Sequence, residues 1–119
     1  MGHELYPDAV YRAGLKDGEL RYQRCDGCGR AVFAPRVACP GCFGTDLTWQ
    51  VSAGRGVVYA ATTVYKRDGS YNVALIDLAE GFRMMSTVEG HPSAVIPIGL
   101  PVRCVVRGGE VPVFEVCDD

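Results

Sequence analysis

The sequence has no long hydrophobic run, and its apolar segments fall well short of the roughly 20 residues that a membrane-spanning helix needs. Met1–Tyr6 also lacks the charged and then apolar pattern of a secretory signal. Lysine is scarce, with only two among the 119 residues, and the formal net charge is −2. We therefore expect neither a membrane protein, nor an exported one, nor a general binder of phosphate backbones.

The balance of the remaining residues is that of an ordinary globular chain, with 48% hydrophobic and 22% charged residues. A chain of this length buries enough surface for a core of its own. Fifteen glycines and few helical patterns favour a β-rich fold. Six cysteines without an export signal indicate a reducing compartment, and we expect a cytoplasmic protein.

Four of the cysteines form two Cys-x-x-Cys pairs about ten residues apart, close to the spacing of zinc ribbons. The predicted metal ligands are Cys25, Cys28, Cys39 and Cys42. Gly27, Gly29 and Gly41 are expected to supply the positive φ that such tight turns need. Four thiolates complete a tetrahedral Zn²⁺ site with no position for water or substrate, so the metal is predicted to be structural. Two disulfides are the weaker alternative, because nothing indicates export.

The N-terminal part is predicted to hold a short helix over Pro7–Leu15, which must dock on its surroundings to persist. The metal module that follows should contain three strands, at Glu19–Arg24, Ala31–Phe33 and Leu47–Ser52. Trp49, the only tryptophan, is interpreted as a core anchor between this module and the rest of the chain. The segment Ala53–Gly56 is predicted to be a turn, because no Walker lysine supports a phosphate-binding loop.

The second half of the sequence contains five strand-like runs separated by turn residues. They cover Val57–Lys66, Tyr71–Leu78, Phe82–Glu89, Val102–Arg107 and Val111–Val116. A three-strand meander, a connection and a hairpin suit the five-stranded OB barrel, although a sandwich could use the same runs. The expected fold is mainly β: an N-terminal helical segment (1–18), a rubredoxin-like zinc ribbon (19–53) and an OB-fold barrel (54–119).

Several segments together resemble the zinc-ribbon-plus-OB-fold family catalogued as domain of unknown function thirty-five. They are Gly18–Cys25, Cys28-Gly29, Phe33–Arg36, Cys39–Cys42, Ser52–Tyr59, Leu78–Arg83 and Ile98-Gly99. The resemblance implies an accessory subunit that forms a hetero-oligomer with a thiolase-fold enzyme: a thiolase, an acyltransferase or a retro-aldolase acting on acyl-CoA thioesters. It also implies that the catalytic residues lie on that partner.

A coenzyme A thioester carries phosphates, which arginine binds bidentately. Arginines cluster in and beside the zinc module, and we take Arg21, Arg24, Arg36 and Arg55 as candidate contacts to such a ligand. Arg30 belongs to the same group. The alternative is a solvated face with salt bridges between subunits. Met85, Tyr59 and Phe43 are candidate apolar contacts to the partner.

The chain alone is predicted to be non-catalytic. Cys104 shares a strand face with Val102 and Val106 and is interpreted as a small buried hydrophobe, while Cys117 lies near a frayed end. Nothing in the sequence places either thiol beside His91. Asp77 and Glu80 are interpreted as solvated or paired with Arg83.

Two other functions are compatible with these modules. Single-stranded nucleic-acid binding would need a cationic groove interleaved with aromatics, and the strands here offer aromatics but few lysines. Electron transfer at an iron site would use the same four cysteines but gives the barrel no role. A red colour would indicate iron, whereas zinc leaves the protein colourless.

Overall fold

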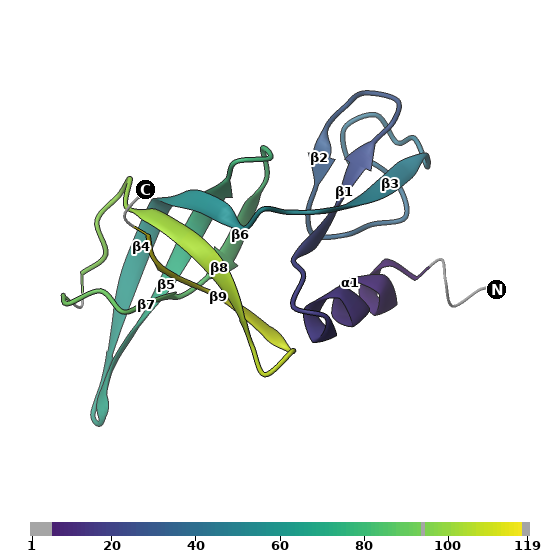
Figure 1. Cartoon of the computed structure of the whole chain (residues 1–119). Coiled ribbons are helices and arrows are strands. Elements are labelled where there is room, and N and C mark those ends of the chain that lie inside the picture. Colours follow the sequence, from purple (N-terminus) through teal and green to yellow (C-terminus); the bar gives the residue numbers. More distant parts are fainter. Residues whose placement is uncertain (1–5, 94, 118–119) are drawn as a thin grey trace.

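The computed structural model describes residues 6–93 and 95–117 and consists of a small three-stranded sheet, a six-stranded sheet and one helix. Figure 1 shows the small sheet above the helix and the larger sheet curled beside both. Within the described residues, no helix is long and apolar enough to span a membrane. The elements are α1 (Pro7–Lys16), β1 (Arg21–Cys25), β2 (Ala31–Val32), β3 (Leu47–Val51), β4 (Arg55–Lys66), β5 (Gly69–Leu78), β6 (Arg83–Ser86), β7 (Val88–Glu89), β8 (Pro101–Arg107) and β9 (Val111–Val116).

Helix α1 begins at Pro7, whose fixed φ suits the first turn, and ends before Gly18, which has a φ of 77°. Gly14 and Leu15 are the buried residues of its inner face, whereas Ala13 is exposed. A Cβ at Gly14 would lie 2.5 Å from Cδ of Arg21. Glycine therefore allows the helix to approach β1 closely, which offsets its low helix propensity.

The small sheet has the order β2-β1-β3, and all its pairings are antiparallel. Gln23 in the central strand is only 3% exposed. Its amide nitrogen donates to the carbonyl of Arg36 at 2.8 Å, and its amide oxygen accepts from the N–H of Arg36 at 2.7 Å. This buried pair of hydrogen bonds holds the loop between the two cysteine pairs against the sheet.

The larger sheet has the order β6-β5-β4-β8-β9-β7 and confirms the OB fold. The predicted strand Phe82–Glu89 is divided at Thr87 into β6, which pairs with β5, and β7, which pairs with β9 in parallel. Val88 lies opposite Phe114 in that parallel pair. This pairing connects the third and last strand runs and closes the barrel. No helix occupies the described part of the connection between β7 and β8, as expected.

Two local features shape the first barrel strand, β4, which pairs with β5 on one side and with β8 on the other. A register shift between Val58 and Ala60 marks a bulge at Tyr59, which bends the strand. A Cβ at Gly56 would lie within 2.4 Å of the carbonyl oxygen of Asp77, so only glycine fits there.

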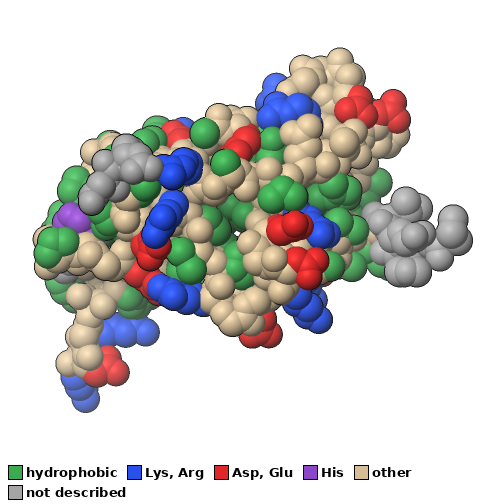
Figure 2. Space-filling view, viewed as in Figure 1, with side chains coloured by type: hydrophobic (Ala, Val, Ile, Leu, Met, Phe, Trp, Pro, Cys, Tyr) green, Lys and Arg blue, Asp and Glu red, His purple; other side chains and the backbone are tan. Residues whose placement is uncertain are grey.

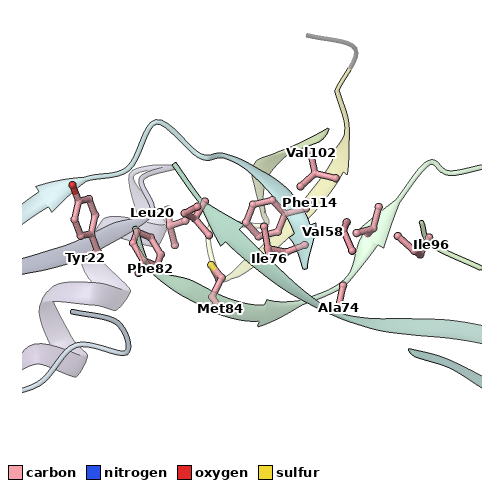
Figure 3. Close-up of a cluster of buried hydrophobic side chains, with 12 residues drawn as sticks. Leu20, Tyr22, Val58, Ala74, Ile76, Phe82, Met84, Ile96, Val102 and Phe114 are labelled. Carbon is pink, nitrogen blue, oxygen red and sulfur yellow. The ribbon is translucent and has the colours of Figure 1, made fainter. Parts of the chain in front are cut away.

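One hydrophobic core joins the barrel to the small sheet and to the helix. Phe82 stacks on Tyr22 of β1, with ring centroids 4.9 Å apart, and on Phe33 at 5.0 Å. Phe33 in turn meets Tyr11 of α1 edge-on at 5.6 Å. Figure 3 shows Leu20 and Tyr22 continuing the row of barrel side chains through Phe82 and Met84. The aromatic row therefore fixes the position of one sheet relative to the other.

Trp49 does not have the predicted role of a core anchor. It is half-buried, does not belong to the shared core, and lines a cavity of about 390 Å³ with Pro7, Gln23 and Arg36 among others. The anchor between the modules is Phe82, which the sequence identified only as the first residue of a predicted strand.

The carboxylate of Glu80 fixes the connection between the two sheets. It accepts from the hydroxyl of Ser52 at 2.8 Å and from the N–H of Ala53 at 2.8 Å. The carbonyl of Glu80 also accepts from the Arg24 guanidinium at 3.2 Å. Asp77 pairs with Arg83 as expected, whereas the half-buried carboxylate of Glu80 bonds Ser52 and Ala53 instead.

We expect Phe82→Ala to lower the free energy of unfolding by about 3–5 kcal/mol, because it removes a buried ring and leaves a cavity between the sheets. Chemical denaturation followed by tryptophan fluorescence and by circular dichroism measures this change. Met85→Ala, three residues further along in β6, is the matched control: its side chain is 67% exposed, so the change should stay within about 0.5 kcal/mol. Equal effects of the two substitutions would contradict the assigned role of Phe82.

Candidate functional site

The four predicted metal ligands meet at one point of the small sheet. The sulfur atoms of Cys25, Cys28, Cys39 and Cys42 all lie within 4.8 Å of one another. The Sγ atoms of Cys25 and Cys42 are 3.5 Å apart, and those of Cys28 and Cys39 are 3.7 Å apart. Cys25 and Cys39 are buried, while Cys28 and Cys42 are exposed, so the cluster lies at the edge of the molecule.

Each cysteine pair is held in a backbone turn, and the two turns use the same hydrogen bonds. In the first, the N–H of Gly29 donates to the carbonyl of Cys25 at 2.8 Å, and the N–H of Cys25 donates to the carbonyl of Arg30 at 2.9 Å. In the second, Phe43 and Gly44 take the places of Gly29 and Arg30, with distances of 2.8 Å for both bonds. The two turns are therefore structurally equivalent knuckles.

The positive φ falls at the residue after each pair rather than inside it. Gly29 has a φ of 79° as predicted, whereas Gly27 and Gly41 do not have positive φ, which corrects that expectation. In the second knuckle the equivalent position is Phe43, with a φ of 62°. The reason is geometric: the chain must reverse at this residue so that the carbonyl of the next residue can accept from the N–H of the first cysteine.

Hydrogen bonds and mutual repulsion control the ionisation of the thiols. The backbone N–H groups of Cys42 and Gly41 lower the pKa of Cys39 to about 6, against the effect of burial. The pKa of Cys42 is raised to about 11: the N–H of Gly44 lowers it, but contact with Cys25, burial and the other cysteines raise it. Neighbouring thiolates thus oppose ionisation of the last thiol, and a divalent cation at the centre would relieve that repulsion.

This donor set fits zinc. A tetrahedron with Zn–S bonds of roughly 2.3 Å has edges of roughly 3.8 Å, which is close to the two short sulfur–sulfur distances. Four thiolates fill the coordination sphere and leave no open position. Such a site can hold two chain segments together, but it cannot activate water or bind a substrate atom.

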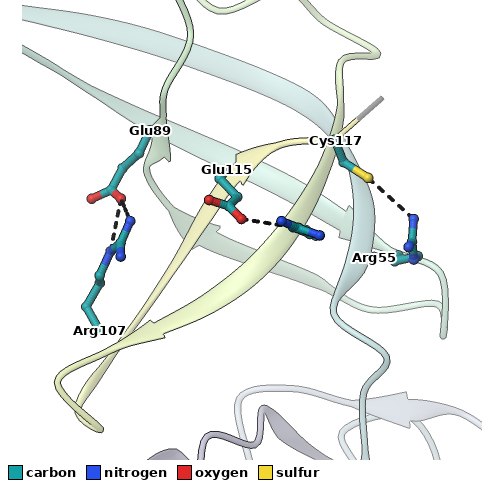
Figure 4. A network of polar contacts seen from close by, with 6 residues as sticks. Arg55, Glu89, Arg107, Glu115 and Cys117 are labelled. Atoms are coloured by element: carbon teal, nitrogen blue, oxygen red, sulfur yellow. Dashed lines mark hydrogen bonds and ion pairs between the residues drawn. The ribbon is translucent and has the colours of Figure 1, made fainter. Parts of the chain in front are cut away.

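The four candidate coenzyme A arginines lie on different elements and face different groups. Arg21 donates to Glu19 and to the carbonyl of Val10, which ties the helix to β1. Arg24 lies over the ring of Tyr22 and donates to the carbonyls of Gly29 and Glu80. Arg55 donates at 3.4 Å to the thiol of Cys117, which directly follows β9 (Figure 4). Arg36 is exposed beside Trp49.

The two cysteines outside the cluster are held in the barrel. Cys104 is half-buried, and burial raises the pKa of its thiol to about 11. Cys117 is buried rather than frayed, because its N–H donates to the carbonyl of Pro101 at 3.0 Å. The ring of His91 bonds only to the backbone of Ser93 among the described residues, so no described cysteine is paired with it.

Most of the barrel's arginines are neutralised by a carboxylate beside them. Arg103 bonds Glu115 at 2.9 Å, and Arg107 bonds Glu89 at 2.6 Å (Figure 4). On the face shown in Figure 2, acidic and basic side chains accordingly lie side by side rather than as one basic surface. Arg83 also pairs with Asp77 while it stacks on the ring of Tyr59.

Comparison with known families assigns both the zinc ribbon and the OB fold. Residues 12–48 match the model described as ChsH2, rubredoxin-like zinc ribbon domain, and residues 49–107 match ChsH2, C-terminal OB-fold domain. A solved structure described as Ltp2-ChsH2(DUF35) aldolase covers 92% of this chain and 93% of its own, with a TM-score of 0.75 and 28% identity. The chain therefore belongs to the ChsH2/DUF35 family of zinc-ribbon and OB-fold proteins.

Two curated relatives are named as subunits of enzymes. The first is the 3-oxo-4,17-pregnadiene-20-carboxyl-CoA hydratase alpha subunit of Mycobacterium tuberculosis, 34% identical over 84% of this chain and 37% of its own length. The second is the benzoylsuccinyl-CoA thiolase subunit BbsA of Thauera aromatica, 28% identical over 63% of this chain and 55% of its own. The chain spans little more than a third of the first and about half of the second.

Sequence reasoning found all four cysteines from their spacing but missed Gln23, the linker contacts of Glu80 and the positive φ of Phe43. A polar residue in the middle of an alternating strand was the available signal for Gln23. Nothing local distinguishes Glu80, because its partners in the linker lie 27 and 28 positions away.

We expect the purified protein to be colourless and to contain one zinc ion per chain, measured by elemental analysis and native mass spectrometry. Cys39→Ser should lose the metal and destabilise the small sheet, because metal binding contributes to its folding free energy. Cys104→Ser is the control, since Cys104 lies outside the cluster. A metal-free wild-type protein with the same thermal unfolding as the loaded one would contradict a structural metal.

Proposed function

We propose that this chain is a non-catalytic, zinc-binding accessory subunit that forms a hetero-oligomer with a thiolase-fold enzyme acting on acyl-CoA thioesters. The partner would be a thiolase, an acyltransferase or a retro-aldolase. The observation that carries the proposal is the match of both modules, over 92% of the chain, to the ChsH2 component of an aldolase assembly. Relatives named as subunits of a CoA-thioester hydratase and of a thiolase support it.

The chemistry of the described residues supports a role without catalysis. The metal donor set is complete in itself, so it offers no site to a substrate. Burial keeps Cys104 protonated at neutral pH, and a nucleophile needs the thiolate. What the chain supplies is a rigid surface, because the shared core and the Glu80 contacts hold the two modules in one arrangement. We place the proposed complex in the cytoplasm, because six cysteines without an export signal indicate a reducing compartment.

Direct contact with the coenzyme A phosphates is the second part of the proposal. Of the four candidates, Arg36 is the best placed: it is exposed, and its guanidinium has no partner among the described residues. Arg21 and Arg24 bond within the chain, and Arg55 bonds Cys117. A guanidinium that is not already committed can bind phosphate without first losing a partner.

Single-stranded nucleic-acid binding is not favoured. That function requires an open cationic groove with aromatic platforms. Here Arg83, which stacks on Tyr59, is paired with Asp77, and Arg103 and Arg107 are paired with glutamates.

Co-expression tests the subunit assignment. The chain and the thiolase-fold enzyme encoded beside it should co-purify as a stable complex in size-exclusion chromatography, and acyl-CoA turnover should require both. The isolated chain should show no turnover. A thiolase-fold enzyme that is soluble and fully active alone, or turnover by the isolated chain, would refute the proposal.

Replacement of Arg36 tests the contact with coenzyme A. Arg36→Gln should raise the KM of the complex for acyl-CoA by about tenfold, since a charge-assisted bond to phosphate is lost, with little change in kcat. Arg67→Gln, at the turn between β4 and β5, is the control. Unchanged KM in Arg36→Gln would remove this part of the proposal and leave the subunit assignment intact.

A further inference from the structure

Phe43 is unusual in both its backbone and its side chain. It is the only described non-glycine residue with a positive φ, at 62°. Its ring is also 81% exposed, more than any other large hydrophobic side chain of the described residues. A left-handed backbone is strained for a residue with a Cβ, and an exposed ring contributes nothing to the core.

The first knuckle shows what this position requires for folding alone. Gly29 occupies the equivalent place, makes the equivalent hydrogen bond and has a φ of 79° without strain. The knuckle backbone thus needs a residue that adopts a positive φ, and it does not need a ring. Neither the metal site nor the core accounts for phenylalanine at position 43.

The surroundings of Phe43 indicate what the ring would meet. A Cβ built on Gly41, two residues away, would lie 2.6 Å from Nε of Arg30, so this guanidinium lies directly over the second knuckle. Arg30 is exposed, and its guanidinium has no hydrogen-bond or ion-pair partner within residues 6–93 and 95–117. The second knuckle therefore carries an exposed aromatic ring two residues from a glycine that an uncompensated guanidinium covers. Aromatic residues and arginine are the side chains that dominate the binding energy of protein interfaces.

We propose that Phe43 is an anchor residue, which inserts its ring into an apolar pocket of the thiolase-fold partner, with a carboxylate at the pocket rim facing Arg30. This inference rests on the proposed function and specifies which surface of the chain forms the interface. Other exposed hydrophobic residues, such as Tyr65 and Ile98, have unstrained backbones and no comparable signal. A surface with one ring and one cation is too small for a nucleic-acid strand, which needs successive stacking platforms.

The substitution Phe43→Gly gives an informative test, because it should separate binding from folding. Glycine suits a φ of 62°, so the melting temperature should equal or exceed that of the wild type, and zinc content should be unchanged. Loss of an anchoring ring should weaken the complex by about tenfold or more. Isothermal titration calorimetry of the zinc-loaded chain with the separately purified thiolase-fold enzyme measures this loss.

Two further variants complete the test. Phe43→Tyr keeps the ring and should retain binding within a few-fold of the wild type, whereas Phe43→Asn, which tolerates a positive φ, should bind as weakly as Phe43→Gly. Tyr65→Ser is the matched control for an exposed aromatic elsewhere, since Tyr65 is 72% exposed at the end of the β4–β5 hairpin, and it should bind like the wild type.

The outcomes distinguish this inference from the proposed function. If the wild-type chain binds the enzyme and Phe43→Gly binds equally well, the anchor assignment is overturned while the subunit assignment stands. If the wild-type chain does not bind at all, the proposed function itself fails. Self-association of the isolated chain that Phe43→Gly abolishes would identify a second copy as the occupant and would also overturn the assignment.

Discussion

The stacking of Phe82 between Tyr22 and Phe33 is the contact on which the arrangement of the molecule depends. It joins the residue that precedes β6 of the barrel to β1 and to the segment that follows β2, and Tyr11 extends the contact to the helix. Because these rings belong to the same buried cluster as the barrel interior, the two sheets share one core. Hinge motion between them would expose that core, so the chain should behave as a single rigid body under native conditions.

The small sheet has little else to stabilise it. Its separate buried cluster contains only Cys25, Val32 and Cys39, with Leu47 packed against them, and two of these residues are metal ligands. A core of this size cannot offset the conformational entropy lost on folding. The sheet is therefore stabilised from two sides, by the metal cluster at its outer edge and by the aromatic row at its inner edge. The need for stabilisation at the outer edge explains why four thiols converge there, although a site of four thiolates leaves no open position for a substrate.

Features that depend on neighbouring residues could be predicted from the sequence, and features that depend on distant pairings could not. The strand-like run Phe82–Glu89 identified a segment of the barrel, and the Cys-x-x-Cys spacing identified the four-cysteine cluster. The division of that strand at Thr87 follows from the parallel pairing of Val88 with Phe114, which no local pattern encodes. Trp49 was misplaced because a single large aromatic indicates burial but not which surface buries it. The positive φ was assigned to Gly27 and Gly41 because glycine adopts a positive φ easily. The position of the reversal is set instead by the hydrogen bonds of each knuckle, which place it at Gly29 and Phe43.

The two cysteine knuckles make equivalent hydrogen bonds, and comparing them shows which residues the knuckle fold requires and which it does not. Where two segments make the same hydrogen bonds, the residue types that differ between them are not required by the shared backbone. Gly29 satisfies the backbone without cost, so the ring at Phe43 adds strain and exposed apolar surface that the isolated chain gains nothing from. In the proposed role, a subunit without catalytic groups acts on its partner only through the surface it presents. We therefore assign the strained and exposed ring of Phe43 to assembly with that partner rather than to folding.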